Sequence, residues 1–290
     1  MTDELLRQRF ELIRRFGCTV LTLSDGVSRL YEGTLPPRSV AITFDDGFYD
    51  FYEKALPILK EFEFPATVYL TTYYSENNKP IFGIAAAYLL WKGKERHLDL
   101  ESLFGLSEIL DLSLESERKK AHSIIVNHAE NHDLSAERKN NLLSELCAQL
   151  DFDFQEFCRS RVLQLMNSKE ITQITKAGID VQLHTHRHRV PMDEQLFGRE
   201  IVDNKRVIET ATGQSPIHFC YPSGQYSSNF FPWLKKAKVV SATTCDAALS
   251  HQGSNPYLLP RLIDTSSLSD VEFEGWIAGA SQFLPQRSVK

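Results

Sequence analysis

The sequence has no apolar run long enough to cross a bilayer. Its longest such stretch, Ile81 to Trp91, is interrupted only by Gly83 and falls short of the roughly 20 residues that a membrane-spanning helix needs. The first 16 residues carry charges every few positions and have no apolar segment of the kind found in signal peptides. We therefore expect a cytoplasmic protein with no membrane span, and a buried helix over residues 81–91.

Paired cysteines and an excess of basic charge are also missing. The cysteines are odd in number, widely spaced and free of any Cys-x-x-Cys pair, which favours reduced thiols. A net charge of −6 and a pI near 5.9 argue against an electrostatic hold on nucleic acid. The remaining composition, 42% hydrophobic and 24% charged, is typical of a folded globular chain.

Strand and helix patterns alternate in two stretches of the chain. A β-rich run covers residues 39–44, apolar residues recur at helical spacing over 49–62, and the next predicted strand covers 66–72. Towards the C-terminus, we predict strands at 179–184, 217–221, 238–244 and 258–263, and helices at 192–210, 228–237 and 269–283. Strands separated by helices predict a mostly parallel sheet, either open or closed into a barrel.

Residues 93–167 break this alternation. They combine dense charge with leucines at helical spacing and show no convincing strand, and they predict amphipathic helices at 115–131 and 135–150. We expect a helical insertion over 93–167 within a single domain covering residues 1–290. Ser168 resembles the N-cap of a following helix that ends before Gly178.

Two adjacent carboxylates, Asp45 and Asp46, follow the first predicted strand of the sheet. Catalytic groups in α/β folds lie at this end of the strands. Because successive side chains of an extended segment point in different directions, one carboxylate can bind a metal while the other acts on a water. The alternative is a simple Asp-Asp-Gly turn with the second Asp capping a helix.

Three histidines, His184, His186 and His188, fall within five residues after another predicted strand. Neutral imidazole is the commonest metal ligand, so this density indicates a metal site rather than a polar surface loop. One turn of helix would bring His184 and His188 to one face and leave His186 on the other. A carboxylate with two imidazoles leaves positions open for water and substrate, as in catalytic sites.

A third motif, Tyr221-Pro222-Ser223-Gly224, follows the strand predicted at 217–221. Gly224 allows the backbone to approach a ligand closely, and N–H groups exposed at such a turn can stabilise an oxyanion. The turn could also be purely structural.

The motifs Thr-Phe-Asp-Asp-Gly, His-Thr-x-x-His and Tyr-Pro-x-Gly, in this order and each after a strand, resemble the polysaccharide deacetylase family, also called the NodB-homology or carbohydrate esterase family 4 group. The resemblance runs from about Phe10 to Phe283, apart from the insertion. It implies a distorted (β/α) barrel of the NodB-homology type with an inserted helical subdomain. It also implies removal of an N-acetyl or N-formyl group from an amino sugar.

The resemblance assigns roles to individual residues. It implies that Asp45 is the general base and that a divalent metal binds Asp46, His184 and His188, with Zn²⁺ expected and Co²⁺, Ni²⁺ or Fe²⁺ as alternatives. The backbone N–H of Tyr221 would face the oxyanion. The residues expected to line the substrate groove are Thr43, Pro222, Ser223 and Gly224.

The chain also departs from the family pattern. The usual Leu-x-x-His near the C-terminus, whose His is the general acid, has no clear counterpart, and the only late histidine is His251. Ile217 and His218 replace the usual arginine before the third motif. The Leu-Pro-Arg at 259–261 resembles a segment of the subgroup found in surface-glycan systems. Arg261 could there orient Asp45, or it could be a solvated surface charge.

The sequence does not decide whether the substrate is a sugar nucleotide, a lipid-linked precursor or an acetylated polymer. It does not indicate the oligomeric state either. We expect a role in surface polysaccharide biosynthesis. One alternative is a catalytically weak glycan-recognition protein that still binds metal, suggested by the missing acid. Another is an amidohydrolase that uses His184 and His186 as its ligand pair.

Overall fold

The computed structural model describes residues 1–77, 80–132 and 134–280. The chain divides into two compact units, the first formed by Met1–Asn77 with Met166–Lys290 and the second by Asn78–Leu165. The second unit begins earlier than the insertion expected at 93–167 and ends close to its expected end.

A five-stranded parallel sheet is the centre of the first unit. Its strand order is β3-β4-β7-β8-β9, and every neighbouring pair is parallel. The strands are β3 (Ile42–Phe44), β4 (Ala66–Leu70), β7 (Asp180–Leu183), β8 (His218–Cys220) and β9 (Ser241–Thr243). Two short strands, β1 (Thr19–Val20) and β2 (Ser39–Val40), form a separate parallel pair. The parallel sheet predicted from the alternation is confirmed.

The two faces of this sheet differ in chemistry because side chains alternate along each strand. One face is apolar and belongs to the main core, with Val68, Leu70, Val181, Leu183 and Phe219 among its buried residues. The opposite face carries mainly polar side chains in register with one another, namely Thr43, Thr67, Tyr69, Gln182, His218, Cys220, Ser241 and Thr243. The motifs lie at the carboxyl ends of these strands.

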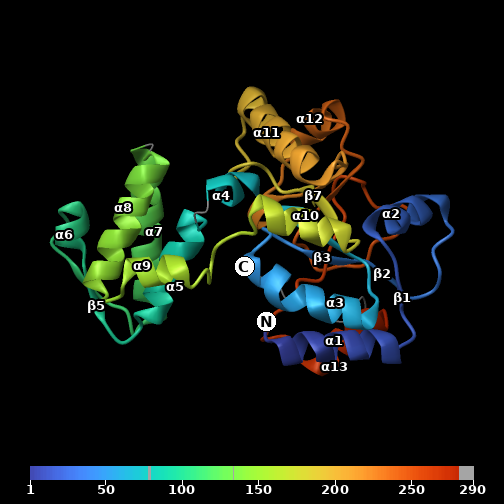
Figure 1. Cartoon of the computed structure of the whole chain (residues 1–290), viewed down its shortest axis with the longest axis horizontal. Helices are drawn as coiled ribbons and strands as arrows, with labels where there is room; N and C mark the ends of the chain where they lie inside the picture. The colour runs from blue at the N-terminus through green and yellow to red at the C-terminus, as the bar shows by residue number, and fades with distance from the viewer. Residues whose placement is uncertain (78–79, 133, 281–290) are drawn as a thin grey trace. The chain divides into compact units, whose positions relative to one another are not determined.

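Helices cover both faces of the sheet. The apolar face is packed by α1 (Asp3–Arg15), α3 (Leu56–Phe62), α10 (Ser168–Lys176), α11 (Glu194–Thr212), α12 (Phe230–Lys236) and α13 (Asp270–Ile277). Figure 1 shows α1 beside α3 and α13. On the polar face, α2 (Leu23–Glu32) inserts Leu23 against Tyr69 and Cys220. A short helix, α4 (Thr72–Asn77), follows β4.

The second unit has its own apolar core. It contains α5 (Phe82–Lys92), β5 (His97–Asp99), α6 (Leu100–Phe104), β6 (Ile109–Asp111), α7 (Glu115–Asn131), α8 (Ala136–Gln149) and α9 (Phe154–Arg159). The helices predicted at 81–91, 115–131 and 135–150 are confirmed. The expectation of no strand was wrong, because β5 and β6 pair antiparallel with Leu98 opposite Leu110, and both of these side chains are buried.

Other elements differ from the sequence prediction in detail. The helix predicted at 49–62 begins as a π-helix, Phe51–Ala55, before α3. Asn167, not Ser168, caps α10, through a capping box with Glu170. Helix α1 has no counterpart among the predicted elements. The helix predicted at 269–283 begins one residue later, at Asp270, and ends at Ile277, earlier than predicted; the predicted residues 281–283 lie outside the described residues.

The strand predicted at 258–263 is reduced to a single bridge between Thr243 and Leu259. Pro260 has no N–H to continue a ladder. The next amide, that of Arg261, donates to the carbonyl oxygen of Asp246 at 3.0 Å. This segment therefore runs beside β9 for one residue and then leaves it, which brings the Arg261 side chain to the site described below.

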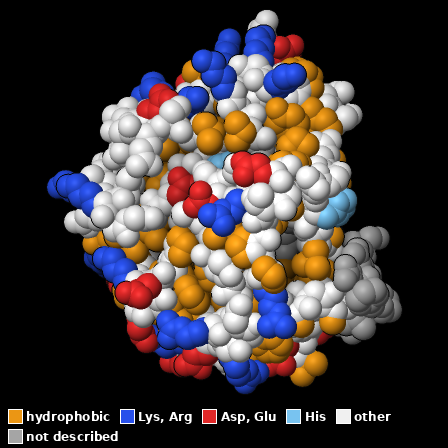
Figure 2. Space-filling view, turned by 90° about the vertical axis from the view of Figure 1, so that its right-hand side faces the viewer, with side chains coloured by type: hydrophobic (Ala, Val, Ile, Leu, Met, Phe, Trp, Pro, Cys, Tyr) orange, Lys and Arg blue, Asp and Glu red, His pale blue; other side chains and the backbone are white. Residues whose placement is uncertain are grey.

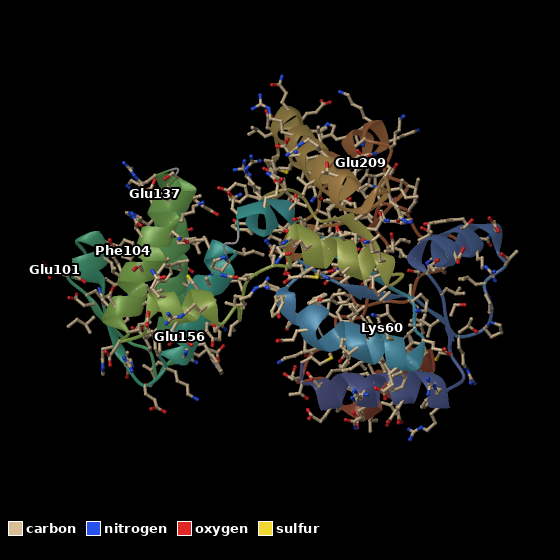
Figure 3. The ribbon with its side chains drawn as sticks, in the orientation of Figure 1. Lys60, Glu101, Phe104, Glu137, Glu156 and Glu209 are labelled. Atoms are coloured by element: carbon tan, nitrogen blue, oxygen red, sulfur yellow. The ribbon has the colours of Figure 1, made fainter. Side chains whose placement is uncertain are left out.

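Exposed charged side chains are spread over both units. Figure 3 labels Glu101, Glu137 and Glu156 in the second unit and Lys60 and Glu209 on α3 and α11, and all five are exposed. On the face seen in Figure 2, lysine and arginine are interspersed with acidic and hydrophobic side chains. No described helix is long and apolar enough to span a bilayer.

Candidate active site

Asp45 and Asp46 lie on a tight turn directly after β3. Asp46 has φ of 66° and Gly47 has φ of 82°, both in the left-handed region. A Cβ atom at position 47 would clash with the Leu70 side chain, so only glycine fits. The Asp46 carbonyl accepts the N–H of Thr71 at 3.1 Å, which anchors the turn to the end of β4. The side chain of Asp46 faces His184 and His188 and not the start of the following helix, so the simple capping alternative does not apply.

Arg261 holds the carboxylate of Asp45 through two parallel hydrogen bonds. Nη1 donates to Oδ1 at 2.7 Å and Nη2 to Oδ2 at 2.8 Å. The same guanidinium donates to Thr43 Oγ1 at 3.1 Å and to the carbonyl of Thr244 at 3.0 Å. Arg261 is thus a largely buried partner of Asp45, with a side chain that is 11% exposed, and not a solvated surface charge.

The electrostatics keep Asp45 ionised. Burial raises its pKa, but the hydrogen bonds and charge of Arg261 outweigh burial and hold the pKa below its usual value. An ionised carboxylate fixed by a bidentate guanidinium is in the form that a general base needs. Cys220 lies beside this pair, with its sulfur 3.0 Å from Nη2 of Arg261.

Asp46, His184 and His188 converge on one point. Oδ1 of Asp46 lies 3.3 Å from Nε2 of His184 and 3.1 Å from Nε2 of His188. This oxygen is buried and makes no hydrogen bond of acceptable geometry. A carboxylate oxygen and two imidazole nitrogens facing one another without such a bond fit the donor set of a divalent metal. The three residues form a group that could hold a metal ion.

A hydrogen bond fixes the orientation of the His184 ring. Nδ1 lies 2.8 Å from the carbonyl oxygen of Cys220, which can only accept, so the proton is on Nδ1 and Nε2 is free to bind a metal. Burial raises the pKa of Asp46, but the two histidines outweigh burial and lower it. The carboxylate is therefore charged, and the point where the three residues meet favours a cation.

A second group of possible ligands, Asp45, His184 and Cys220, also lies within reach of a single ion. Both carboxylate oxygens of Asp45 already accept hydrogen bonds from Arg261. The guanidinium charge beside them disfavours a metal cation at this position. We therefore regard the group around Asp46 as the better metal site.

The loop that carries the histidines is not the helical turn expected from their spacing. β7 ends at Leu183, and the following residues are irregular. Thr185 and His188 have φ of 61° and 54°, and the two metal-facing rings meet at 5.1 Å between centroids. Left-handed non-glycine residues cost of order 1–3 kcal/mol each and persist where surrounding contacts hold them. The left-handed backbone at Thr185 and His188, and not a helical turn, brings the two imidazoles together.

His186 faces away from this group. Its Nδ1 lies 2.8 Å from Thr72 Oγ1, and its ring makes an edge contact with Tyr73. Among the described residues, neither group of possible metal ligands includes His186. The arrangement gives no support to a ligand pair of His184 and His186, as the amidohydrolase alternative requires.

The third motif forms a 3-10 turn, Pro222–Gly224, in which Ser223 and Gly224 have φ of 55° and 65°. A Cβ atom at position 224 would come within 2.9 Å of Cys245, which explains the glycine. The side chain of Tyr221 is buried in the main core, and its backbone N–H donates to the carbonyl of Thr243 at 3.2 Å. The oxyanion role expected for this amide therefore requires it to leave that bond.

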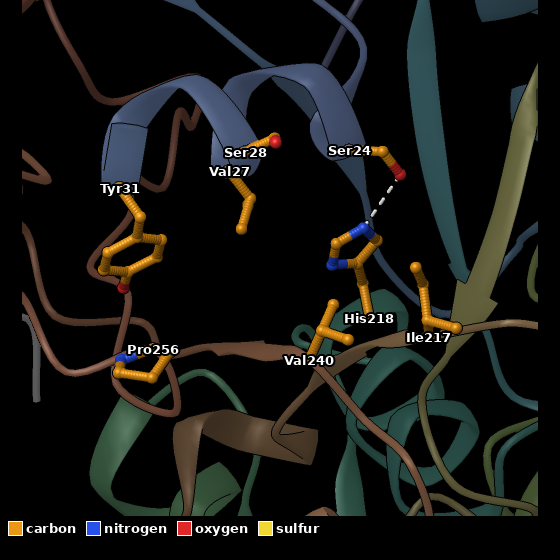
Figure 4. A pocket seen from close by; sticks show the side chains of 8 residues that line it. All are labelled: Ser24, Val27, Ser28, Tyr31, Ile217, His218, Val240 and Pro256. Atoms are coloured by element: carbon orange, nitrogen blue, oxygen red, sulfur yellow. Dashed lines mark hydrogen bonds between the residues drawn. The ribbon is translucent and has the colours of Figure 1, made fainter. Parts of the chain in front are cut away.

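His218 lies at the opposite end of β8 from the motifs. It is buried between two hydroxyl groups, with Nε2 2.9 Å from Ser24 and Nδ1 2.8 Å from Ser241. Figure 4 shows it beside a pocket of about 360 Å³ under α2. Burial lowers the pKa of His218 to about 4, so this imidazole is neutral.

His251 is an exposed residue of the loop before Pro256. Its Nδ1 accepts the N–H of Gly253 at 3.2 Å, and the neighbouring Gln252 donates to the carbonyl of Tyr31 on α2. None of the hydrogen bonds described for this loop reaches the residues around Asp46. The general acid therefore has no assigned residue.

Among the residues that sequence reasoning missed is a buried support of the site, Asn204 on α11. Its Oδ1 accepts the backbone N–H of His184 at 2.9 Å, and its Nδ2 donates to Leu70 and Thr72. No local pattern distinguishes this asparagine from a solvated helix residue. Only the position of α11 against the end of β7 gives it this contact.

Comparison with known proteins gives one family. The profile described as Polysaccharide deacetylase matches residues 32–242. The poly-beta-1,6-N-acetyl-D-glucosamine N-deacetylase of Staphylococcus epidermidis is 33% identical over 72 residues, 25% of this chain and 25% of that protein. The enzyme of the same name from Staphylococcus aureus is 28% identical over 255 residues, 88% of this chain and 62% of that protein. Both matches span less than two thirds of the relative.

Solved structures give the same fold. The Streptococcus pyogenes deacetylase PplD, in complex with acetate, has a TM-score of 0.62 at 15% identity over 95% of this chain and 86% of that chain. IcaB from Ammonifex degensii has a TM-score of 0.60 at 15% identity, covering 96% and 89%. The predicted fold class, a distorted (β/α) barrel of the NodB-homology type, is confirmed; the parallel sheet forms a curled half-barrel.

Proposed function

This chain belongs to the polysaccharide deacetylase family, and we propose that it is a metal-dependent hydrolase that removes N-acetyl groups from an amino-sugar glycan. The observation that carries this proposal is the orphaned Oδ1 of Asp46 between two imidazole nitrogens, next to a carboxylate held by Arg261. A metal-facing group and a separate ionised base are two of the parts that metal-assisted amide hydrolysis uses.

The named relatives support a polymeric substrate. Two of them are poly-beta-1,6-N-acetyl-D-glucosamine N-deacetylases, so we propose a β-1,6-linked N-acetylglucosamine polymer, or a closely related surface glycan, as the substrate. A lipid-linked precursor and a sugar nucleotide remain the competing substrates. Thr43 and the turn of Pro222–Gly224 are the proposed walls of the groove.

The chain's own residues have separate tasks in the reaction. Asp46, His184 and His188 would hold the metal, for which Zn²⁺ is our first choice, and the metal supplies polarisation of the acetamide carbonyl and activation of water. Asp45 accepts the proton of the attacking water, because its lowered pKa keeps it ionised at neutral pH. Arg261 aims that carboxylate through its two hydrogen bonds.

A second function is favoured by one observation. No described histidine other than the two ligands has been assigned to the site, so protonation of the leaving amine has no identified donor. A catalytically weak protein of the same fold, which binds metal and glycan, would need no such donor. Water reaching the leaving nitrogen would allow slow turnover in either version.

The test is acetyl release across substrate classes. The protein is loaded with Zn²⁺ or Co²⁺ and incubated with β-1,6-linked and β-1,4-linked N-acetylglucosamine oligomers and with a nucleotide-linked N-acetyl sugar. Mass spectrometry then detects the loss of acetyl. The proposal predicts turnover of the β-1,6-linked oligomers above the others. Binding of the oligomers with no acetyl loss from any substrate would support the glycan-recognition alternative.

A further inference from the structure

Helix α11 turns two buried polar side chains towards the loop that carries the metal-facing histidines. Glu200 is 1% exposed and Asn204 is fully buried. They are four positions apart in the chain, so they lie on one face of the helix. Asn204 holds the backbone of His184, as described above, whereas Glu200 contacts the later part of the loop.

The carboxylate of Glu200 collects three hydrogen bonds from both sides of His188. Oε2 accepts the backbone N–H of Arg187 at 2.7 Å. Oε1 accepts Nη1 of Arg187 at 3.2 Å and Nε of Arg189 at 2.8 Å. A buried carboxylate is stable only when it is paired and hydrogen-bonded in this way. Both residues adjacent to His188 are therefore tied to one fixed group.

The same loop contains the two left-handed residues. Thr185 has φ of 61° and His188 has φ of 54°, and the Arg189 N–H donates to Thr185 Oγ1 at 3.1 Å. Such conformations persist where contacts on both sides over-determine them. Glu200 is the group that anchors the side of the loop beyond Thr185, where His188 turns back towards Asp46.

We propose that Glu200 is a positioning residue for metal binding: by fixing Arg187 and Arg189, it holds His188 in the left-handed conformation that aims Nε2 at Asp46. This inference rests on the proposed function, since it concerns the same metal site. Glu200 touches neither the metal-facing atoms nor the substrate, and it acts only through the loop.

The decisive variant is Glu200→Gln, which keeps the size of the side chain and removes its charge. We expect its Zn²⁺ affinity, measured by competition with a chromogenic chelator, to fall by about 10–100-fold, as for other outer-shell partners of metal ligands. The absorption spectrum of the Co²⁺ form should also change, because His188 is displaced. A matched control is Glu194→Gln on the same helix, which breaks an exposed pair with Lys236 and should change neither readout.

Three outcomes separate the possibilities. Equal Zn²⁺ affinity and Co²⁺ spectra in Glu200→Gln and the wild type would overturn the positioning role while leaving the proposed function standing. Absence of metal binding by the wild type would overturn both. If Glu200→Gln fails to fold, Arg189→Gln decides, because Arg189 is more than half exposed: a loss of Zn²⁺ affinity of severalfold supports the proposal, and wild-type affinity overturns it.

Discussion

The two compact units differ in what they bury. In the part of the chain that the structure describes, every buried Ser, Thr, Asn, Gln, His or charged side chain belongs to the first unit. The buried residues that form the core of the second unit are Leu, Ile, Ala and Phe, with one cysteine, Cys147. Both units have an apolar core of their own, and only the first adds a polar layer to it.

This difference separates residues needed for folding from residues needed for chemistry. Burying apolar surface is favourable by itself, and a leucine-rich helical core such as that of the second unit requires nothing more. Buried polar groups are costly unless each finds a partner. The first unit satisfies most of them with partners, such as Asn204 with the backbone N–H of His184, and leaves the buried Oδ1 atom of Asp46 without a hydrogen bond where a metal would sit.

The largest expected effect comes from removing the proposed base. Asp45→Asn keeps the shape of the side chain and should lower the rate of acetyl release by about 10²–10⁴-fold, with metal still bound. Asp111→Asn is the control in the second unit, where the carboxylate at the end of β6 accepts the N–H of Ser113. Equal rates for Asp45→Asn and the wild type would show that Asp45 is not the catalytic base.

Truncating the apolar core of the second unit should affect stability alone. Leu146 is 1% exposed, and Leu146→Ala should lower the free energy of unfolding of this unit by about 2–5 kcal/mol. Urea denaturation measures this loss, and Leu114→Ala, at an exposed position of the same unit, is the control. Zn²⁺ affinity should not change. A parallel loss of Zn²⁺ affinity would contradict the separation of roles between the units.

Lowering the pH should destabilise the first unit, because His218 is buried there in its neutral form. Its pKa in the folded protein is about 4, against 6.5 for an ordinary histidine. The unfolded state therefore binds more protons between these values, and stability falls by about 3 kcal/mol as the pH drops from 6.5 to 4. His218→Asn should lose this part of the pH dependence in urea denaturation. His97→Asn, at an exposed position of the second unit, should retain it; identical curves for both variants would refute the assignment.

The smallest effect expected is on the pH profile. Arg261→Lys keeps a positive charge but cannot form the bidentate pair, so the rate should fall by roughly tenfold. Because Arg261 holds the pKa of Asp45 down, its loss raises that pKa and moves the acid limb of the profile to higher pH. Arg118→Lys, whose guanidinium binds carbonyl groups in the second unit, is the control. An unshifted limb would mean that Arg261 does not set the ionisation of Asp45.

The sequence was sufficient to predict the sheet, most of its helices and the motif residues that meet at the site. This succeeded because β-rich runs end in polar residues, and the carboxyl ends of parallel strands share one edge. Asp45, Asp46, His184, His188 and Arg261 do lie together. Their roles stay predictions until activity and metal binding are measured.

Contacts between distant positions account for what the sequence could not predict. The left-handed geometry at Thr185 and His188 depends on Glu200 and Asn204, which lie on the following helix and look like ordinary helix residues in the sequence. Pro260, which has no N–H to donate, ends the strand that the flanking residues 258–263 were expected to form. The polar face of the sheet could not be predicted from the sequence, because strands of three to five residues are too short to show a clear alternation of polar and apolar side chains.

The most direct test of the metal site is anomalous diffraction at the zinc edge from crystals grown with Zn²⁺. We expect one peak per chain, about 2.0–2.2 Å from Oδ1 of Asp46 and from the Nε2 atoms of His184 and His188. The Asp46→Ala variant should lose this peak. A peak bounded by Asp45, His184 and Cys220, or no peak in the wild type, would rule out a metal site formed by Asp46, His184 and His188.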